Sequence, residues 1–319
     1  MKIRVFALGL TIVLTLVVGC AQATPTVAPP TPTVAPPTPT TLPPTPTEVP
    51  TVVVVDDAQR TVEIIGVPER IISLAPSNTE ILFALGLGDR VVGVSDWSDY
   101  PPKAREIEKV GGMPLNKEKI VSLEPDLLLA AGITSSEDIA WMEEMGLVVL
   151  VLNSIDIEGV LRDIELVGRA AGAEEGATKL VTQMRTDYEA VVSKTRGAKG
   201  LRVFIELDET LYTVAPGSFI HPLVVLAGGE NIASDADNPY PQFSAEEVIA
   251  RDPEVIILAD AEYGVTPEAV AGRPGWEVIT AVKNGAVYPI DGDIISRPGP
   301  RIVDGLEELA RIIHPELFK

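Results

Sequence analysis

Four loops of the sequence carry aromatic or arginine side chains suited to contacting a ligand. Trp97 lies in "SDWSDYPP", Tyr212 in "ETLYTVAPGS", Tyr240 in "DNPYPQ" and Arg297 in "SRPGPR". Aromatic faces stack on flat apolar groups, and a guanidinium binds polar or anionic groups. The four loops therefore indicate a wide apolar site with one cation, suited to a large flat ligand with polar edges. The alternative is that each aromatic side chain packs onto its own part of the fold.

Motifs for enzymatic chemistry are not found in the sequence. His221 and His314 are its two histidines, too few for a metal site of clustered histidines and carboxylates. We expect His314, next to Pro315, at the surface. No G-x-S-x-G elbow, Walker motif or G-x-G-x-x-G after a strand is present. We therefore expect a binding protein with no catalytic residues, no metal site and no cofactor. An α/β enzyme tethered outside the cell and a structural surface protein remain alternatives.

The charge balance restricts the partners further. The formal net charge is −21 at pH 7. Such a surface repels phosphate backbones, so we expect no nucleic-acid partner.

One phrase of the sequence occurs twice. "EKIVSLEPDLLLAA" begins at Glu118 and "EEVIARDPEVIILA" begins at Glu246, so that Pro125 falls on Pro253. Each phrase predicts a short helix, a proline and a buried strand. Such joints are common and a chance similarity is an alternative. Similar elements flank both phrases, however, which indicates two halves of one design.

Strands alternate with helices through the first half. We expect a hairpin, then four short buried strands separated by helices, with Asn78 or Thr79 capping the first helix. These elements are expected at residues 51–64, 70–75, 76–88, 90–95, 116–125, 126–131, 136–146, 148–153 and 157–172.

A long helical pattern at 174–195 separates this half from a second set of elements. Those are expected at residues 201–208, 219–232, 244–253, 254–260, 285–291 and 300–318. The fold class is therefore α/β, with two lobes that have central, mostly parallel sheets, joined by a single long helix, and a ligand cleft between the lobes. The expected boundaries are 51–172 for the N-terminal lobe, 173–198 for the interlobe helix and 199–319 for the C-terminal lobe.

The N-terminus has the pattern of a secretion signal. Lys2 and Arg4 precede an apolar run that is too short for a membrane span. "VVGC" resembles a bacterial lipobox, which predicts a signal peptide at 1–19 and a lipidated Cys20; an ordinary signal peptide with an incidental cysteine is the alternative. Residues 20–50 are rich in Pro and Thr and predict a polyproline-II spacer. A ligand for a proline-reading domain and a glycosylated stalk are alternatives.

From Arg70 to its end the sequence resembles class III periplasmic binding proteins of ABC importers. The motifs "RIISLAPSNTEILFALG", "SDYPP", "GGENI" and "SRPGPRI", together with the repeated phrase, carry the resemblance. This family binds cobalamin, haem and ferric siderophores, and "PSNTE" and "SDYPP" are most similar to its cobalamin-binding members. The resemblance implies two Rossmann-like lobes bridged by one helix.

The resemblance also implies ligand-binding residues. The motif positions fall on Ser77, Trp97, Tyr212, Tyr240, Ser296 and Arg297. The sequence departs from the pattern near Met113 and Ala131, where tryptophans that line the pocket of a cobalamin-binding member align. The smaller side chains leave less area for stacking.

Finally, the resemblance implies that Glu118 and Glu246 dock to arginines of a permease dimer, which works with ATPase subunits. A carboxylate at a helix start is favoured by the helix dipole, so an ordinary helix-start role is the alternative. We expect a monomeric lipoprotein, anchored outside the cytoplasm, that captures a metal chelate. The leading ligand is cobalamin or a related corrinoid, and haem or a ferric siderophore is the rival.

Overall fold

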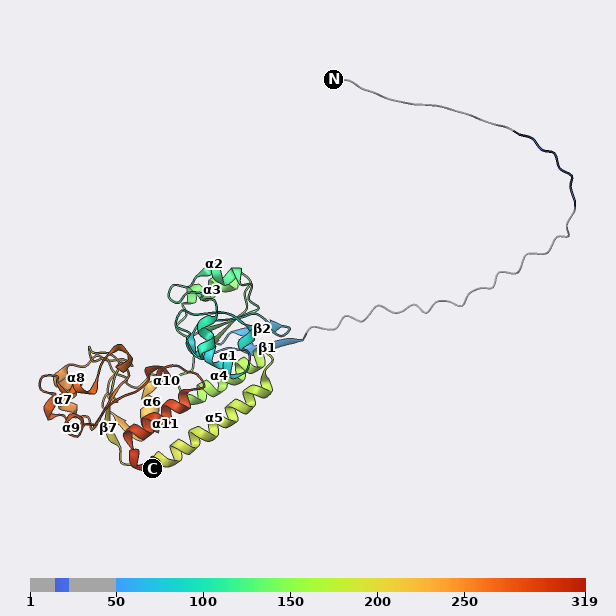
Figure 1. Cartoon of the computed structure of the whole chain (residues 1–319). Helices are drawn as coiled ribbons and strands as arrows, with labels where there is room; N and C mark the ends of the chain where they lie inside the picture. Colours follow the sequence, from blue (N-terminus) through green and yellow to red (C-terminus); the bar gives the residue numbers. More distant parts are fainter. Residues whose placement is uncertain (1–14, 23–49) are drawn as a thin grey trace, which may run out of the picture. The chain divides into compact units, whose positions relative to one another are not determined.

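Residues 15–22 and 50–319 are described by the structure, a computed structural model, and the folded unit is Glu48–Lys319 (Figure 1). Residues 15–22 contain no helix or strand, and Cys20 is exposed. Most of the predicted signal peptide and of the proline-rich spacer lies outside the described residues. Among the helices of the described residues, none has the length and apolar character needed to cross a membrane.

Two four-stranded parallel sheets form the centres of the two lobes. The first has the order β4-β3-β5-β6 and the second β10-β9-β7-β8. If the strands are numbered within each lobe, both orders are 2-1-3-4. The N-terminal strands are β3 (Ile71–Ser73), β4 (Val91–Val94), β5 (Leu127–Ala131) and β6 (Val149–Leu152), and the C-terminal strands are β7 (Leu201–Glu206), β8 (Gly229–Asn231), β9 (Val255–Leu258) and β10 (Val287–Pro289). The internal repeat is therefore a repeat of topology.

Helices accompany both sheets, as parallel sheets require. In the N-terminal lobe they are α1 (Pro76–Ala84), α2 (Lys117–Ser122), α3 (Ser136–Glu144) and α4 (Ile157–Ala170). In the C-terminal lobe they are α6 (Ile220–Leu226), α7 (Ala245–Arg251), α8 (Pro267–Ala271), α9 (Thr280–Lys283), α10 (Gly292–Ser296) and α11 (Ile302–Ile313).

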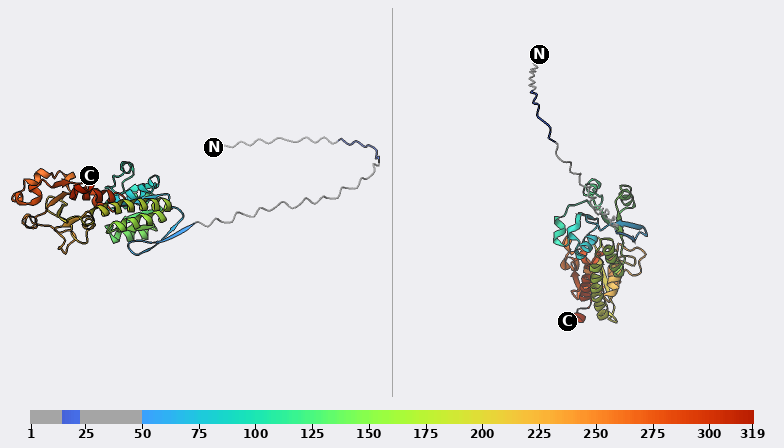
Figure 2. Two further views of the ribbon diagram at one scale, coloured as in Figure 1. Left: turned by 90° about the horizontal axis from the view of Figure 1, so that it is seen from below. Right: turned by 90° about the vertical axis from the view of Figure 1, so that its right-hand side faces the viewer.

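The long helix α5 (Glu174–Thr195) lies between the two lobes in sequence and contacts both. It packs against α4 of the N-terminal lobe and against α11 of the C-terminal lobe (Figures 1 and 2). Its buried side chains include Val181 and Met184. The predicted helical spine is confirmed.

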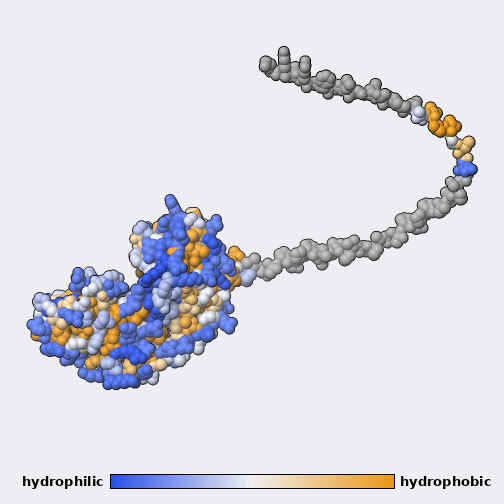
Figure 3. Space-filling model, viewed as in Figure 1, coloured by the Kyte–Doolittle hydropathy of each residue, from blue (hydrophilic) through white to orange (hydrophobic). Residues whose placement is uncertain are grey.

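The antiparallel hairpin of β1 (Thr51–Val55) and β2 (Thr61–Ile65) is also confirmed. Val54, Val62 and Ile64 are buried, while Val53 and Val55 are exposed. This alternation is the period of two expected when one face of a hairpin is covered. The face of the folded unit that is visible in Figure 3 is mostly hydrophilic, with scattered hydrophobic residues, as is usual for a water-facing surface.

The repeated phrase is repeated in its backbone and hydrogen bonds as well. Glu124 after α2 and Asp252 after α7 both have φ of 44°, a left-handed conformation that ends each helix before its proline. The next acid in each phrase then binds the start of the first strand. Asp126 accepts from the backbone N–H of Arg70 at 2.9 Å, and Glu254 accepts from that of Arg202 at 3.1 Å. Chance similarity does not explain such matched geometry.

The structure differs from the sequence-based expectations in some local features. Asn78 and Thr79 do not cap α1, because Pro76 occupies its first turn and Ala75 is the N-cap without a side-chain bond. Both residues are buried inside the helix. The three-residue strand β8 was not predicted, because two glycines precede or begin it and its side chains give no clear alternation.

His314 was expected at the surface and is buried, with 3% of its area exposed. Its Nε2 lies 3.1 Å from the carbonyl oxygen of Gly228, and its Nδ1 lies 3.2 Å from Glu316. The ring therefore ties the end of α11 to the loop before β8. The sequence could not show this contact, because its two sides are 86 residues apart.

Asp260, just beyond β9, is a buried acid without a partner. It is 2% exposed, and neither carboxylate oxygen has a hydrogen-bond partner among the residues that the structure describes. Burial, and then the charge of Glu206, raise the pKa of Asp260 to about 6. Glu206 itself is paired with Arg273. Since the folded-state pKa exceeds the ordinary value of 3.8, protonation favours the folded state, and stability is lost as the pH rises through 6.

Asp260→Asn is therefore expected to stabilise the protein more at pH 8 than at pH 4, by about 1–2 kcal/mol in the free energy of unfolding. Urea denaturation of both proteins at the two pH values measures this difference. Asp187→Asn, at an exposed position on α5, is the control. An equal effect of Asp260→Asn at both pH values would contradict the assignment of an unpaired buried carboxylate.

Candidate functional site

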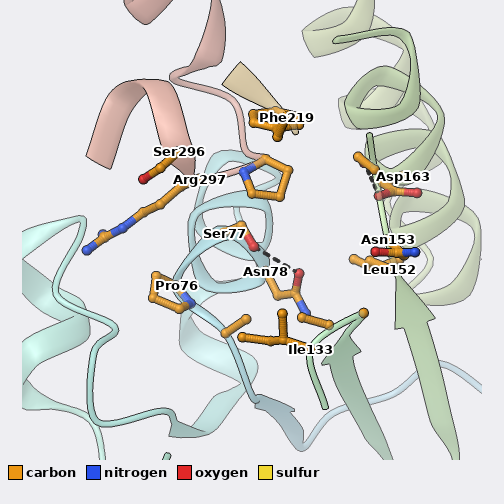
Figure 4. Close-up of a pocket in the computed structure, with 15 residues that line it drawn as sticks. Pro76, Ser77, Asn78, Ile133, Leu152, Asn153, Asp163, Phe219, Ser296 and Arg297 are labelled. Atoms are coloured by element: carbon orange, nitrogen blue, oxygen red, sulfur yellow. Dashed lines mark hydrogen bonds between the residues drawn. The ribbon is translucent and has the colours of Figure 1, made fainter. Parts of the chain in front are cut away.

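A pocket lies where the carboxyl ends of three N-terminal strands face the C-terminal lobe. Its volume is about 270 Å³. Ends of parallel strands are the usual place for ligands in α/β folds, because the loops that follow them vary freely without disturbing the sheet. The pocket is lined by Ala75, Pro76, Ser77, Asn78, Ala131, Gly132, Ile133, Leu152, Asn153, Ser154 and Asp163, and from the other lobe by Phe219, Ser296, Arg297 and Pro298 (Figure 4). Three predicted ligand-binding residues, Ser77, Ser296 and Arg297, are thus brought together.

The first turn of α1 forms one wall of the pocket and is fixed to the neighbouring strand. The side-chain amide of Asn78 donates to the carbonyl oxygens of Leu129 and Ala130, both at 3.1 Å. Ser77 is buried, and its Oγ lies 3.4 Å from Asn78 Oδ1. Asn78 therefore positions Ser77 at the pocket, a role that the sequence alone did not indicate.

A buried hydroxyl cluster positions the loop that carries Trp97. The Thr79 hydroxyl donates a hydrogen bond to Ser98 Oγ at 2.9 Å, and Ser98 Oγ lies 2.8 Å from Ser95 Oγ. The Lys109 ammonium donates to the Ser98 carbonyl oxygen at 2.6 Å. These contacts hold the backbone on both sides of Trp97 in place.

Trp97 does not line this pocket, and 51% of its area is exposed. Its ring lies over Gly112, where an added Cβ would be 2.5 Å from Trp97 Cη2. Met113 and Ile133 are also exposed beside it and share a second hollow of about 220 Å³ with it. Ile133 was missed by sequence reasoning, because a single isoleucine after a strand carries no distinctive signal.

Tyr212 and Tyr240 lie on two joined loops of the C-terminal lobe. A backbone bridge links Tyr212 with Gln242, and the N–H of Thr213 donates to the carbonyl oxygen of Pro241. Both tyrosines are exposed. They are not part of the pocket lining in Figure 4. The structure therefore places them together on one surface, separate from Ser77 and Arg297.

Arg297 reaches the pocket wall but is held in an ion cluster that crosses between the lobes. Its Nη1 lies 2.8 Å from Asp99 Oδ1 and 3.4 Å from Glu80 Oε1, and its Nη2 lies 2.5 Å from Asp293. Burial acts to raise the pKa of Asp99, but the hydrogen bond and charge of Arg297 outweigh it and lower that pKa. The expected cation is therefore largely neutralised by the protein itself.

Arg301 completes the ion cluster, which we define as Glu80, Asp99, Asp293, Arg297 and Arg301. Its Nε and Nη2 donate to the two oxygens of the buried Glu80 at 2.9 and 2.7 Å, and these bonds raise the pKa of the Arg301 guanidinium. The guanidinium also stacks 4.1 Å from the ring centre of Tyr100. Sequence reasoning missed Glu80, although an acid on a helix that is otherwise buried is a usable signal.

Asp163 is a second missed residue. It lies on α4, whose face toward the sheet carries Val160, Ile164 and Val167, and it is 3% exposed. The signal was a lone carboxylate on the apolar face of an amphipathic helix. Phe219 and Asn153 of the pocket carried no comparable signal.

The two glutamates of the repeated phrase occupy equivalent positions. Glu118 is the second residue of α2 and Glu246 the second residue of α7, and both side chains are exposed. Within the described residues, no group of three or more His, Cys, Asp or Glu side chains is arranged to hold a metal ion.

The two-lobed α/β architecture with an interlobe pocket defines a ligand-binding class of protein. The family model "Periplasmic binding protein" matches residues 71–294, well over half of the chain. The chain belongs to this family, which comprises substrate-binding transport proteins.

Curated relatives support the same family. A Bacillus subtilis protein described as an uncharacterised ABC transporter substrate-binding lipoprotein, YvrC, is 39% identical over 277 residues, covering 84% of this chain and 87% of the relative. A vitamin B12-binding protein of Vibrio cholerae is 33% identical over 249 residues, covering 76% and 87%.

Solved structures agree with the fold. The crystal structure of the vitamin B12-binding protein BtuF of Vibrio cholerae has a TM-score of 0.70 at 32% identity, covering 79% of this chain and 98% of that one. A Staphylococcus epidermidis protein described as possibly iron-binding has a TM-score of 0.68 at 30% identity, covering 77% and 99%.

The ion cluster yields a stability prediction. Glu80→Gln leaves Arg297 and Arg301 half-buried without their shared partner, so the free energy of unfolding is expected to fall by about 2–4 kcal/mol. Glu307→Gln, which breaks an exposed pair with Arg311, is the control and is expected to change it by at most about 0.5 kcal/mol. Urea denaturation measures both. Equal small effects would show that the cluster does not hold the lobes.

Proposed function

We propose that the protein is the extracytoplasmic substrate-binding component of an ABC importer, and that it captures cobalamin or a related corrinoid in the cleft between its lobes. The observation that carries the proposal is the pocket at the carboxyl ends of β3, β5 and β6, closed from the opposite lobe by Phe219 and the segment 296–298. The relatives described as vitamin B12-binding proteins support the choice of ligand.

The dimensions of the pocket fit part of such a ligand. A volume of about 270 Å³ is just below the usual range of ligand pockets, so we propose that it takes one edge of the corrin ring with its substituents. The rest of the ring lies outside the pocket, and we propose that it stacks on the exposed side chains of Trp97, Tyr212 and Tyr240, which do not line the pocket.

A haem or ferric-siderophore ligand is the second candidate. It is favoured by the similarity to the protein described as possibly iron-binding. Met113 and Ala131 also give less stacking area than the tryptophans expected there for a corrin ring. We rank the corrinoid first because curated relatives of known ligand at 31–33% identity are described as binding vitamin B12.

The route to the membrane follows from the N-terminus. We propose that Cys20 carries a lipid after removal of residues 1–19, and that the proline-rich stretch spaces the folded unit from the membrane. The relative described as a lipoprotein supports this anchor. A monomer anchored in this way has its lobes free to meet a permease.

Glu118 and Glu246 are proposed as the contacts with arginines of a permease dimer, which works together with ATPase subunits. The two lobes share one topology, so equivalent residues present equivalent surfaces. A two-fold symmetric permease offers one site to each glutamate. The helix-start position adds no burial, so both carboxylates are available to a cationic partner.

Calorimetric titration tests the ligand. Cyanocobalamin is expected to bind with a stoichiometry of one and haemin to bind more weakly. The double variant Trp97→Ala with Tyr240→Ala is expected to lose at least about tenfold in affinity, since each aromatic side chain that the ligand covers contributes about 0.5–1.5 kcal/mol beyond the area that it buries. Tyr288→Ala, on the outer strand β10, is the control. Binding of haemin alone would overturn the corrinoid assignment, and an unchanged double variant would place the site elsewhere.

The docking pair is tested by charge reversal. Glu118→Lys with Glu246→Lys is expected to leave ligand affinity and unfolding unchanged, because exposed charges contribute at most about 1 kcal/mol to stability. ATPase stimulation in vesicles with the cognate permease is expected to be lost, because like charges then meet.

The matched control is Glu137→Lys with Glu268→Lys. These are exposed first-turn glutamates of α3 and α8, one on each lobe. Their reversal is expected to preserve stimulation. Full stimulation by the Glu118 and Glu246 variant would contradict the docking role and leave the repeat as symmetry of the fold.

A further inference from the structure

The inner wall of the pocket is built from the end of β6 and the first turns of α4. Asn153 and Ser154 follow β6, and Asp163 reaches the same wall from the helix (Figure 4). The Ser154 hydroxyl donates a short hydrogen bond to Asp163. Asp163 and Arg297 are the two ionisable residues of the lining, and they lie on opposite sides of the pocket (Figure 4).

A second carboxylate stands behind Asp163. Asp57, in the turn between β1 and β2, accepts the backbone N–H of Asn153 at 2.6 Å, and its charge acts on Asp163. The other charged groups that face Asp163 are Arg162 on its own helix and Arg297 across the pocket. Asp56, the neighbour of Asp57, is already paired with Arg60 at 2.5 Å.

Among the residues that the structure describes, no cation forms an ion pair with Asp57 or Asp163. Arg162 is exposed, and Arg297 is committed to the ion cluster. Burial first, and then the charge of Asp57 and a hydrogen bond with its side chain, raise the pKa of Asp163 to about 7, against the hydrogen bond from Ser154. An apolar side chain at this position of α4 would continue its buried face without this cost. A buried acid in the lining of a pocket therefore points to recognition of a ligand group.

We propose that Asp163 binds a hydrogen-bond-donating group of the ligand, of the primary-amide kind that surrounds a corrin ring, at the inner wall of the pocket. This inference rests on the proposed function, because it assigns one polar edge of the ligand to one residue of that site. A carboxylate accepts hydrogen bonds only, so it selects a donor and repels a ligand carboxylate. Asp163 is thus a specificity-determining residue that favours amide-edged ligands over acid-edged ones.

Proton release on binding follows from this geometry. An amide N–H donated to Asp163 favours its ionised form, so the proton held by part of the population leaves to solvent. With a pKa of about 7 in the free protein, about half a proton is released at pH 7, and affinity rises roughly tenfold between pH 6 and pH 8. A ligand with a carboxylate at the same position would take up protons on binding, and its affinity would fall as the pH rises, because it requires Asp163 to be protonated.

Calorimetry of cyanocobalamin binding in two buffers of different ionisation enthalpy measures the protons exchanged. The folded, mature chain is expected to release about half a proton at pH 7. Asp163→Asn is expected to release none, to bind about tenfold more weakly at pH 8, and to show no rise in affinity between pH 6 and pH 8. Asp260→Asn removes a buried acid of raised pKa that does not line this pocket, and is expected to exchange protons as the wild type does.

The outcomes separate the inference from the proposed function. Binding of cyanocobalamin with no proton release, with proton uptake, or with unchanged release in Asp163→Asn overturns the role of Asp163 and leaves the function in place. Failure of cyanocobalamin to bind at all overturns the corrinoid function and the inference with it. Thermal unfolding of Asp163→Asn shows whether that variant is folded. If it is not, the wild-type measurement alone tests the inference: proton release supports it, and no release or proton uptake overturns it.

Discussion

The carboxylate of Glu80, buried between two arginines of the other lobe, is the contact on which the cleft depends. Arg301 holds both of its oxygens, and Arg297 bridges from it to Asp99. Glu80 lies on α1, whose first turn is one wall of the pocket, and Arg297 belongs to the opposite wall. The same ion cluster therefore fixes the positions of both walls. Its members need one another, because each charge is costly to bury alone.

The helix α5 supplies the second constraint on the lobes. It contacts α4 and α11 along its length, and helix packing of this kind resists bending more than an extended linker does. The relative position of the two lobes is thus restrained by the packing of α5 on α4 and α11 and by the ion cluster between the lobes. Such a site is preformed, and a preformed site loses less free energy to ordering when a ligand binds.

Periodicity and turn chemistry predicted most of the fold, because strands, helices and their caps are local properties. The repeated phrase even predicted that two lobes share a topology. Predictions failed where a distant residue decides the outcome. Thr79 was predicted to cap the first helix, but its hydroxyl instead forms hydrogen bonds with Ser73 and Ser98 inside the lobe. His314 was predicted to lie at the surface, but its ring is buried and contacts the carbonyl oxygen of Gly228.

The candidate site was predicted less completely than the fold. Loop aromatics and Arg297 were visible as residue types, since their chemistry is unusual in loops. Residue spacing in the sequence could not predict that Arg297 pairs with Asp99 or that Asp57 lies close to Asp163, because each pair joins separate parts of the chain. The chemistry of the pocket depends on these pairs, since they decide which charges remain for a ligand.

The distance between the lobes, with and without ligand, tests the preformed cleft most directly. Spin labels at cysteines replacing the exposed Glu137 and Glu268, in a chain with Cys20→Ser, report it by pulsed electron spin resonance. The ion cluster and α5 predict one narrow distance distribution that shifts by less than about 2 Å when cyanocobalamin is added. A broad distribution that narrows and shortens by much more on binding would show that the lobes close like a hinge, and would contradict the account.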